Sequence, residues 1–150
     1  MNSRLRTHVT FRSPAFDTTG PKEYFINPDN YGDDLAGWLM RELRNRGVEV
    51  GDEPDQEDHG WYFTFRSCGV AHDFIIGLRE EDEWLGWLER SVGPVASLLG
   101  ARKRGIRPEA VLEIDAVLSG SEHIRDVRWH FEEDFMAGRE GLGRREPDAV

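Results

Sequence analysis

Two strand-like segments separated by a very short turn place the strongest limit on how this chain folds. Residues 61–65 are rich in aromatic side chains, residues 70–78 supply a returning strand, and Ser67, Cys68 and Gly69 between them are typical of a hairpin turn. A turn of this length cannot form the crossover that parallel strands require, so the two strands pair antiparallel. The sequence therefore predicts a sheet that is largely antiparallel.

Three further segments have the pattern of strands. Residues 5–12 alternate apolar and polar side chains with the period of two that is expected of a half-buried strand. Residues 84–89 favour a third strand of the meander, with a short helix as the alternative, and residues 124–131 predict a closing strand with an imperfect alternation. Together with the hairpin, these segments supply the strands of the expected sheet.

Helical patterns occur in three places. The first helix follows Asn30, which can cap it, and ends before Gly47, with an apolar stripe at Leu35, Trp38, Leu39 and Leu43. Residues 93–105 and a segment from Pro108 to Gly120 predict two more helices. Because each helix has to bury its apolar stripe, we expect a two-layer α+β fold with about three helices packed on one face of the sheet.

The length and composition suit one domain. The chain has 150 residues, 38% of them hydrophobic and 11% aromatic, which is enough for an independent core. We expect residues 1–138 to form a single α+β domain and the charged residues 139–150 to form a flexible tail. The first residues are too polar for a signal peptide, no stretch is apolar enough for a membrane span, and a single cysteine excludes an internal disulfide. We therefore expect a cytoplasmic protein.

The net charge limits the classes of partner. With 19 basic and 29 acidic side chains the formal charge is −10, and such a protein repels phosphate backbones and anionic lipids. We therefore expect neither a nucleic-acid partner nor a membrane partner. A basic protein is the partner class that this charge favours, since a negative surface attracts it over distance.

An acidic segment beside aromatic residues is the strongest candidate for a binding surface. Residues 49–58 hold six acids and no base, and the Gly and Pro among them predict an exposed loop. Because aromatic anchors and acidic rims favour the capture of basic partners, we predict a partner-binding surface made of Asp52, Glu53, Asp55, Glu57, Asp58, Trp61 and Tyr62. The alternative is that the aromatic residues belong to the core and the acidic loop is ordinary surface.

The candidates for catalysis are weak. Cys68 and His72 are four positions apart and His130 follows Trp129, but the sequence has no motif for nucleophilic catalysis, phosphate binding or zinc around them. We therefore keep Cys68, His72 and His130 as weak catalytic candidates and expect no metal and no cofactor. A pocket between the sheet and the helices would use them together with Arg128.

Several short segments resemble a group of small uncharacterised bacterial proteins. They are residues 25–28 (FINP), 31–36 (YGDDLA) with Trp38 and Leu39, and 125–129 (RDVRW), with residues 60–62 (GWY) between them. The resemblance covers roughly residues 25–130. It implies a bacterial cytoplasmic domain, and because the group has no established activity it implies no site residue.

These observations predict a non-enzymatic acidic binding protein. An immunity-type neutraliser of a basic protein fits the small size, the single domain and the net charge of −10. The alternative is a small enzyme or a small-molecule-binding domain that uses a pocket between the sheet and the helices.

Overall fold

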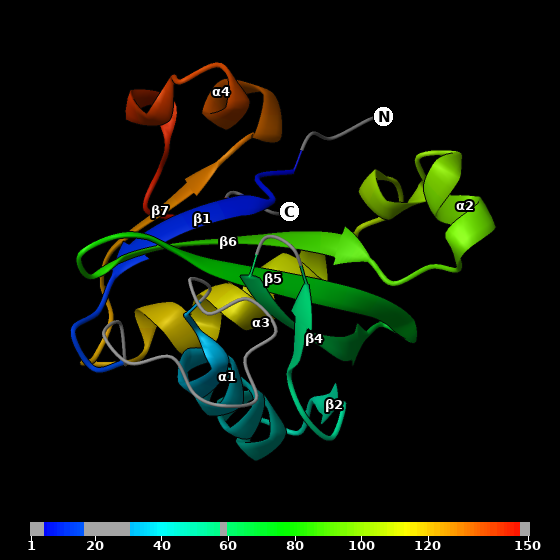
Figure 1. Cartoon of the computed structure of the whole chain (residues 1–150), viewed down its shortest axis with the longest axis horizontal. Helices are drawn as coiled ribbons and strands as arrows, with labels where there is room; N and C mark the ends of the chain where they lie inside the picture. The colour runs from blue at the N-terminus through cyan, green and yellow to red at the C-terminus, as the bar shows by residue number, and fades with distance from the viewer. Residues whose placement is uncertain (1–4, 17–30, 58–59, 148–150) are drawn as a thin grey trace.

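The computed structural model describes residues 5–16, 31–57 and 60–147 of the chain (Figure 1). In this part of the chain seven strands form one sheet in the order β2-β4-β5-β6-β1-β7, with β3 also paired to β4. The strands are β1 (His8–Arg12), β2 (Glu49–Val50), β3 (Asp55–Glu57), β4 (Gly60–Ser67), β5 (Val70–Glu80), β6 (Glu83–Arg90) and β7 (Arg125–His130). The helices are α1 (Asp33–Asn45), α2 (Pro94–Leu98), α3 (Pro108–Ser119) and α4 (Glu132–Met136), with the 3-10 helices η1 (Ala101–Lys103) and η2 (Glu140–Leu142). All strand pairs are antiparallel, which confirms the predicted α+β class and sheet.

The β4–β5 hairpin that the sequence predicts is present. Ser67 pairs with Val70, so Cys68 and Gly69 form a two-residue loop. Both have a positive φ, 52° and 74°. This is the geometry of the type I′ turn, whose twist matches that of the flanking strands. Glycine adopts a positive φ freely, whereas a cysteine does so at a cost.

Replacing Cys68 with asparagine should stabilise the protein. Asparagine tolerates a positive φ better than cysteine does and is the preferred residue before glycine in this turn, so we expect C68N to raise the free energy of unfolding by about 0.5 kcal/mol. C68V should lower it, because a β-branched side chain is disfavoured at this φ. Urea unfolding at neutral pH measures both, and equal stabilities of the two variants would contradict the proposed role of the turn.

The segment at residues 84–89, for which strand and helix were both open, belongs to the strand β6. Its exposure alternates, with Trp84 and Leu88 in the core and Leu85 and Trp87 on the opposite face. A helix would have placed these four side chains on one side. The alternation with a period of two identifies this segment as a strand, and the strand prediction is confirmed.

The two long helices cover one face of the sheet, which we call the core face (Figure 1). Their fully buried side chains include Leu35, Leu39 and Leu43 of α1 and Val111, Ile114 and Leu118 of α3. They pack against the sheet residues Val9, Phe11, Phe63, Phe74, Trp84 and Trp129. Each buried aliphatic side chain contributes about 1.5–3 kcal/mol. The stripe predicted for the first helix is confirmed, and its predicted cap Asn30 lies outside the described residues.

The helix predicted at residues 93–105 is divided in two. Gly100 has a φ of 79°, a left-handed conformation that separates α2 from η1. Val95 and Leu98 of α2 are 74% and 88% exposed, so this helix projects from the sheet (Figure 1). The short helix α4, which the sequence did not predict, lies on the side of the sheet away from α1 and α3 (Figure 1). We call that side the outer face.

The acidic segment contains two edge strands. β2 and β3 both pair with β4, and the residues between them form a bend. The exposed loop predicted for residues 49–58 is therefore wrong at these strands. The physical reason is that backbone groups of β4 need hydrogen-bond partners whatever the side chains of the neighbouring segment are.

Residues 139–147 lie against the sheet. The backbones of Trp129 and Arg144 exchange hydrogen bonds of 2.6 and 2.9 Å. A Cβ atom on Gly143 would lie 2.4 Å from the His130 ring, so glycine permits this close approach. The docked position differs from the flexible tail predicted for residues 139–150, of which the last three lie outside the described part. Among the helices described, none combines the length and the apolar character that crossing a membrane requires.

Candidate functional site

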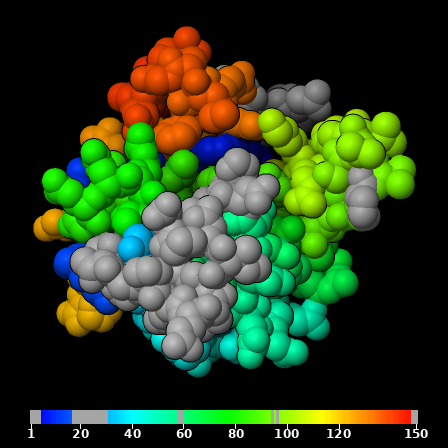
Figure 2. Space-filling model, viewed as in Figure 1, coloured from blue at the N-terminus to red at the C-terminus, as the bar shows by residue number. Residues whose placement is uncertain are grey.

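The outer face carries a groove between β1, β6, η1 and α4. Its volume is about 710 Å³, within the range of small-molecule binding sites. In the space-filling view β1 is visible between α4 and α2 (Figure 2). The apolar lining includes Leu5, Leu85, Trp87, Ile106, Phe135 and Met136. Met136 is 73% exposed and forms part of the rim.

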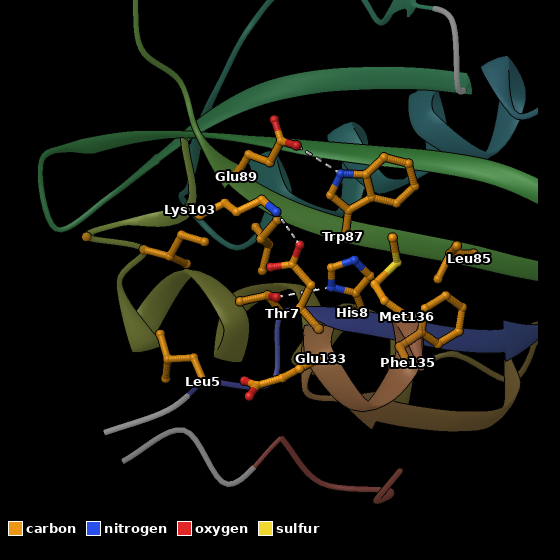
Figure 3. Close-up of a pocket in the computed structure, with 14 residues that line it drawn as sticks. Leu5, Thr7, His8, Leu85, Trp87, Glu89, Lys103, Glu133, Phe135 and Met136 are labelled. Carbon is orange, nitrogen blue, oxygen red and sulfur yellow. Dashed lines mark hydrogen bonds and ion pairs between the residues drawn. The ribbon is translucent and has the colours of Figure 1, made fainter. Parts of the chain in front are cut away.

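The strand period explains why these side chains meet. His8 of β1 is paired with Trp87 of β6, and both side chains point away from the core. Leu85 is two residues from Trp87 and therefore lies on the same face. α4 brings Phe135 against His8, with 5.7 Å between the ring centroids. Figure 3 shows this arrangement, with Trp87 and Phe135 on two sides of the His8 ring.

His8 is the polar group at the bottom of the groove. It is 8% exposed, and its ring is nearly parallel to Trp87, with 5.9 Å between centroids and 12° between planes. Its Nδ1 lies 3.1 Å from the hydroxyl of Thr7. Burial is the main cause that lowers the pKa of His8 from 6.5 to about 4, so the ring is neutral at pH 7.

The charged lining of the groove is mainly acidic. Three carboxylates, Glu89, Glu132 and Glu133, face one ammonium, Lys103. Lys103 binds Glu132 at 2.6 Å, which raises the pKa of Lys103, but its side chain is 68% exposed. Such an exposed pair contributes at most about 1 kcal/mol and exchanges readily with other charges.

Glu89 is held by two further contacts. The indole Nε1 of Trp87 donates a hydrogen bond to Glu89 at 3.2 Å. The guanidinium of Arg102 lies 3.1 Å from the other carboxylate oxygen. The carboxylate is therefore oriented beside the aromatic floor, as Figure 3 shows for Trp87 and Glu89.

The predicted acidic surface is only partly present as predicted. Asp52, Glu53 and Asp55 are exposed and Glu57 is half-buried, while Asp58 lies outside the described residues. Trp61 is 5% exposed and belongs to the core, so it cannot serve as a surface anchor. The alternative stated for the aromatic residues is therefore correct for Trp61.

Tyr62 lies on the outer face at the acidic edge. It is paired with Asp55, and the pairing continues across the sheet through Ile75 and Trp87 to His8. Burial, followed by the charges of nearby carboxylates including Asp55, raises the pKa of Tyr62. One row of paired residues thus connects the acidic edge to the floor of the groove.

Two of the catalytic candidates have no shared site. Cys68 is exposed at the hairpin turn. His72 is fully buried on the core face beside Phe65, two rungs of the ladder away from the turn. Its Nδ1 donates to the carbonyl of Val70 at 2.9 Å, and its Nε2 accepts from the backbone N–H of Arg107 at 3.1 Å. Burial lowers the pKa of His72. The neutral ring therefore links the backbone at Val70 to the backbone at Arg107.

His130 lies on the outer face, opposite to His72. It is 1% exposed, its Nε2 lies 2.9 Å from the hydroxyl of Thr10, and its Nδ1 has no hydrogen-bond partner among the described residues. Burial lowers the pKa of His130. His130 and Arg128 line a second cavity of about 930 Å³. The structure therefore brings these two candidates together and keeps Cys68 and His72 apart from them.

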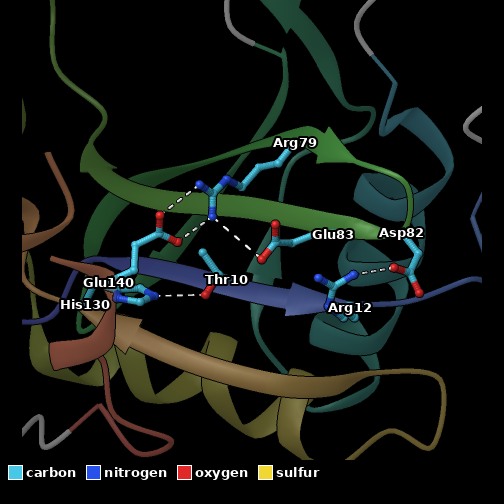
Figure 4. Close-up of polar contacts among 7 residues, drawn as sticks. All are labelled: Thr10, Arg12, Arg79, Asp82, Glu83, His130 and Glu140. Carbon is cyan, nitrogen blue, oxygen red and sulfur yellow. Dashed lines mark hydrogen bonds and ion pairs between the residues drawn. The ribbon is translucent and has the colours of Figure 1, made fainter. Parts of the chain in front are cut away.

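A polar network fixes the C-terminal segment next to His130 (Figure 4). Arg79 donates hydrogen bonds of 2.7 and 3.1 Å to Glu140 and lies 3.7 Å from Glu83. These contacts raise the pKa of Arg79 and lower that of Glu140. Separately from these contacts, Asp82 accepts a hydrogen bond of 2.8 Å from Arg12. The network stabilises η2 on the sheet and thereby covers His130.

Sequence reasoning missed the groove. His8, Trp87 and Glu89 were read as parts of strands, and α4 was not predicted. His8 is one of four polar residues on its side of the alternation at residues 5–12, with Arg6, Thr10 and Arg12, so nothing local sets it apart. Its pairing with Trp87 requires the strand order, which the sequence does not reveal.

The described residues contain no group of three or more His, Cys, Asp and Glu side chains that is arranged to hold a metal ion. The resemblance to small bacterial proteins stays a prediction. A scan against protein-family models finds no match for this chain, and searches of the curated proteins and of the solved structures find none either.

Proposed function

We propose that this protein is a non-enzymatic binding protein whose outer face captures a basic protein. The observation that carries the proposal is the groove, in which apolar and aromatic side chains form the floor and Glu89, Glu132 and Glu133 supply negative charge. Interfaces use buried aromatic anchors for affinity and charged rims for attraction and specificity. This combination suits a partner surface that is both basic and partly apolar.

The acidic edge supports the same partner. Asp52, Glu53 and Asp55 are exposed at the edge of the same sheet whose outer face carries the groove. In a chain with a net charge of −10 they add to a field that accelerates association with a positive surface. A neutraliser of a basic toxin or nuclease would use the same field to cover a positive cleft.

The positions of the catalytic candidates favour binding over catalysis. Nucleophilic catalysis needs a base within hydrogen-bond reach of the nucleophile. His72 is fully buried, with both ring nitrogens hydrogen-bonded to the backbone, whereas Cys68 is exposed at the turn. His130 lies on the opposite face of the sheet.

Affinity capture from a lysate of the source organism tests the proposal. The immobilised protein should retain a basic protein at stoichiometric yield, and stepped salt should elute it. The triple variant D52N/E53Q/D55N should weaken this binding about tenfold, from three exposed charge pairs of about 0.5 kcal/mol each. The matched control E42Q/E113Q/E122Q removes the same charge from the side of α1 and α3 and should have a smaller effect. Equal effects of both triples would contradict a role of the acidic edge in this binding.

A small-molecule site is the second candidate function. The volume of about 710 Å³ and the neutral imidazole of His8 at the bottom of the groove favour it, because such sites combine apolar walls with a few placed polar groups. Thermal-shift screening against metabolites distinguishes the two. A stabilising metabolite together with an empty capture experiment would replace the proposed function with this one.

A further inference from the structure

We infer that the groove on the outer face binds one arginine side chain of the basic partner. The inference rests on the proposed function and adds the identity of the anchoring residue. It follows from the match between two parts of the groove and two parts of an arginine. The aliphatic stem needs an apolar surface, and the guanidinium needs flat rings and carboxylates.

The floor of the groove suits the stem and the flat head. Leu85, Trp87 and Phe135 supply apolar surface, and the half-buried indole of Trp87 is a flat ring on which a planar guanidinium can stack. Arginine is more weakly hydrated than lysine, so it loses less on entering such a site.

The carboxylates lie on two sides of this floor. Glu89 belongs to β6, and Glu132 and Glu133 belong to the first turn of α4. A guanidinium has five N–H donors in a rigid fork, which can serve acceptors in two directions, whereas an ammonium acts as a point charge. The charge of the lining therefore selects a cation, and its arrangement selects a forked one.

The protein itself already uses this contact around the groove. The guanidinium of Arg79 lies 5.3 Å from the ring centroid of Phe135, and that of Arg6 lies 4.1 Å from the ring centroid of Phe131. Aromatic rings in this segment thus accept guanidinium groups in the folded protein. At neutral pH His8 is uncharged and does not repel a guanidinium that enters the groove.

Two cations of the protein already pair with these carboxylates. Arg102 lies 3.1 Å from Glu89, and Lys103 binds Glu132 at 2.6 Å while its side chain stays 68% exposed. An incoming guanidinium has to share or displace this ammonium. Removing the charge of Lys103 should therefore strengthen binding of arginine, an effect opposite in sign to that of most substitutions in a binding site.

Titration with blocked amino acids tests the inference without a partner protein. N-acetyl-arginine amide, N-acetyl-lysine amide and N-acetyl-norleucine amide are added in the millimolar range, and the indole N–H signals are followed by NMR, with the Trp87 signal assigned from W87F. We expect arginine to bind about tenfold more tightly than norleucine, with lysine between them.

Two variants and a control make the test decisive. K103Q should tighten arginine binding about threefold, and E89Q should weaken it about fivefold, on the scale of charge-assisted hydrogen bonds at partly exposed sites. E122Q removes an exposed carboxylate outside the groove and should leave arginine binding unchanged. Equal binding of arginine and norleucine, or weaker binding in K103Q, would overturn the inference. If the titration gives one of these results while capture of a basic protein still depends on the acidic edge, only the arginine anchor is wrong. If the titration and the capture experiment both fail, the proposed function is wrong as well.

Discussion

Lowering the pH from 7 to 4 should remove about 3 kcal/mol of folding free energy through His8 alone. The pKa of His8 is lowered from 6.5 to about 4 in the folded protein, first by burial. Glu132 and Glu89 oppose this shift, while His130 and Lys103 add to it. Between these two pKa values the unfolded chain binds a proton that the folded protein does not bind. Stability is therefore fully present above pH 6.5 and is lost as the pH falls toward 4.

Two other histidines act in the same direction. Burial also lowers the pKa of His72 and of His130, so each adds to the loss in the acid range. A protonated His130 would lie next to His8 in the register of β1 and β7, and the two charges would repel each other. We expect the contacts of α4 with both rings to weaken first, because Phe135 packs against both of them.

Urea unfolding at pH 7, 5.5 and 4 measures this effect. H8Q removes the titrating group, so its free energy of unfolding should fall by about 3 kcal/mol less than that of the wild type between pH 7 and pH 4. H123Q removes an exposed imidazole from the turn before β7 and serves as the matched control. Parallel pH profiles of the wild type and H8Q would show that the ring is not buried as a neutral group.

The hairpin was predictable because a local pattern determines it. A two-residue loop between two apolar segments leaves only antiparallel pairing. Residues 84–89 were less well determined, because their apolar side chains suit a helical face as well as a strand, and the alternating burial in the sheet identifies the strand β6. The helix α1 was predictable for a related reason, since Leu35, Leu39 and Leu43 lie on one face only if the segment is helical.

The groove was not predictable because it depends on long-range pairing. His8 meets Trp87 only through the β1–β6 register, and Phe135 reaches them only because α4 crosses to the outer face. The assignment of Trp61 to a binding surface failed for the opposite reason. Local sequence shows an aromatic residue beside acidic ones. Because successive side chains of β4 point to opposite faces, Trp61 lies in the core and Tyr62 on the outer face.

Replacing Gly86 with alanine should destabilise the protein by about 2–3 kcal/mol. A Cβ atom at this position would lie 2.4 Å from Cζ of Phe74 and 3.0 and 3.1 Å from its two Cε atoms. Phe74 is fully buried in the core between the sheet and the helices, so its ring has little room to move. The glycine therefore lets the ring of β5 lie across the backbone of β6.

The double variant G86A/F74L distinguishes this contact from a general loss of stability. F74L removes the ring that the new methyl group would strike, so the two substitutions together should cost at least about 1 kcal/mol less than the sum of the single effects. G37A is the control, because Gly37 lies in α1 with only Arg41 Nη1 near its Cβ position, at 3.6 Å, and an alanine in a helix should stabilise by up to about 1 kcal/mol. Additive effects of G86A and F74L in urea unfolding would contradict the contact. A coupled result would mean that the ring of Phe74 lies over the backbone of β6 because Gly86 carries no side chain.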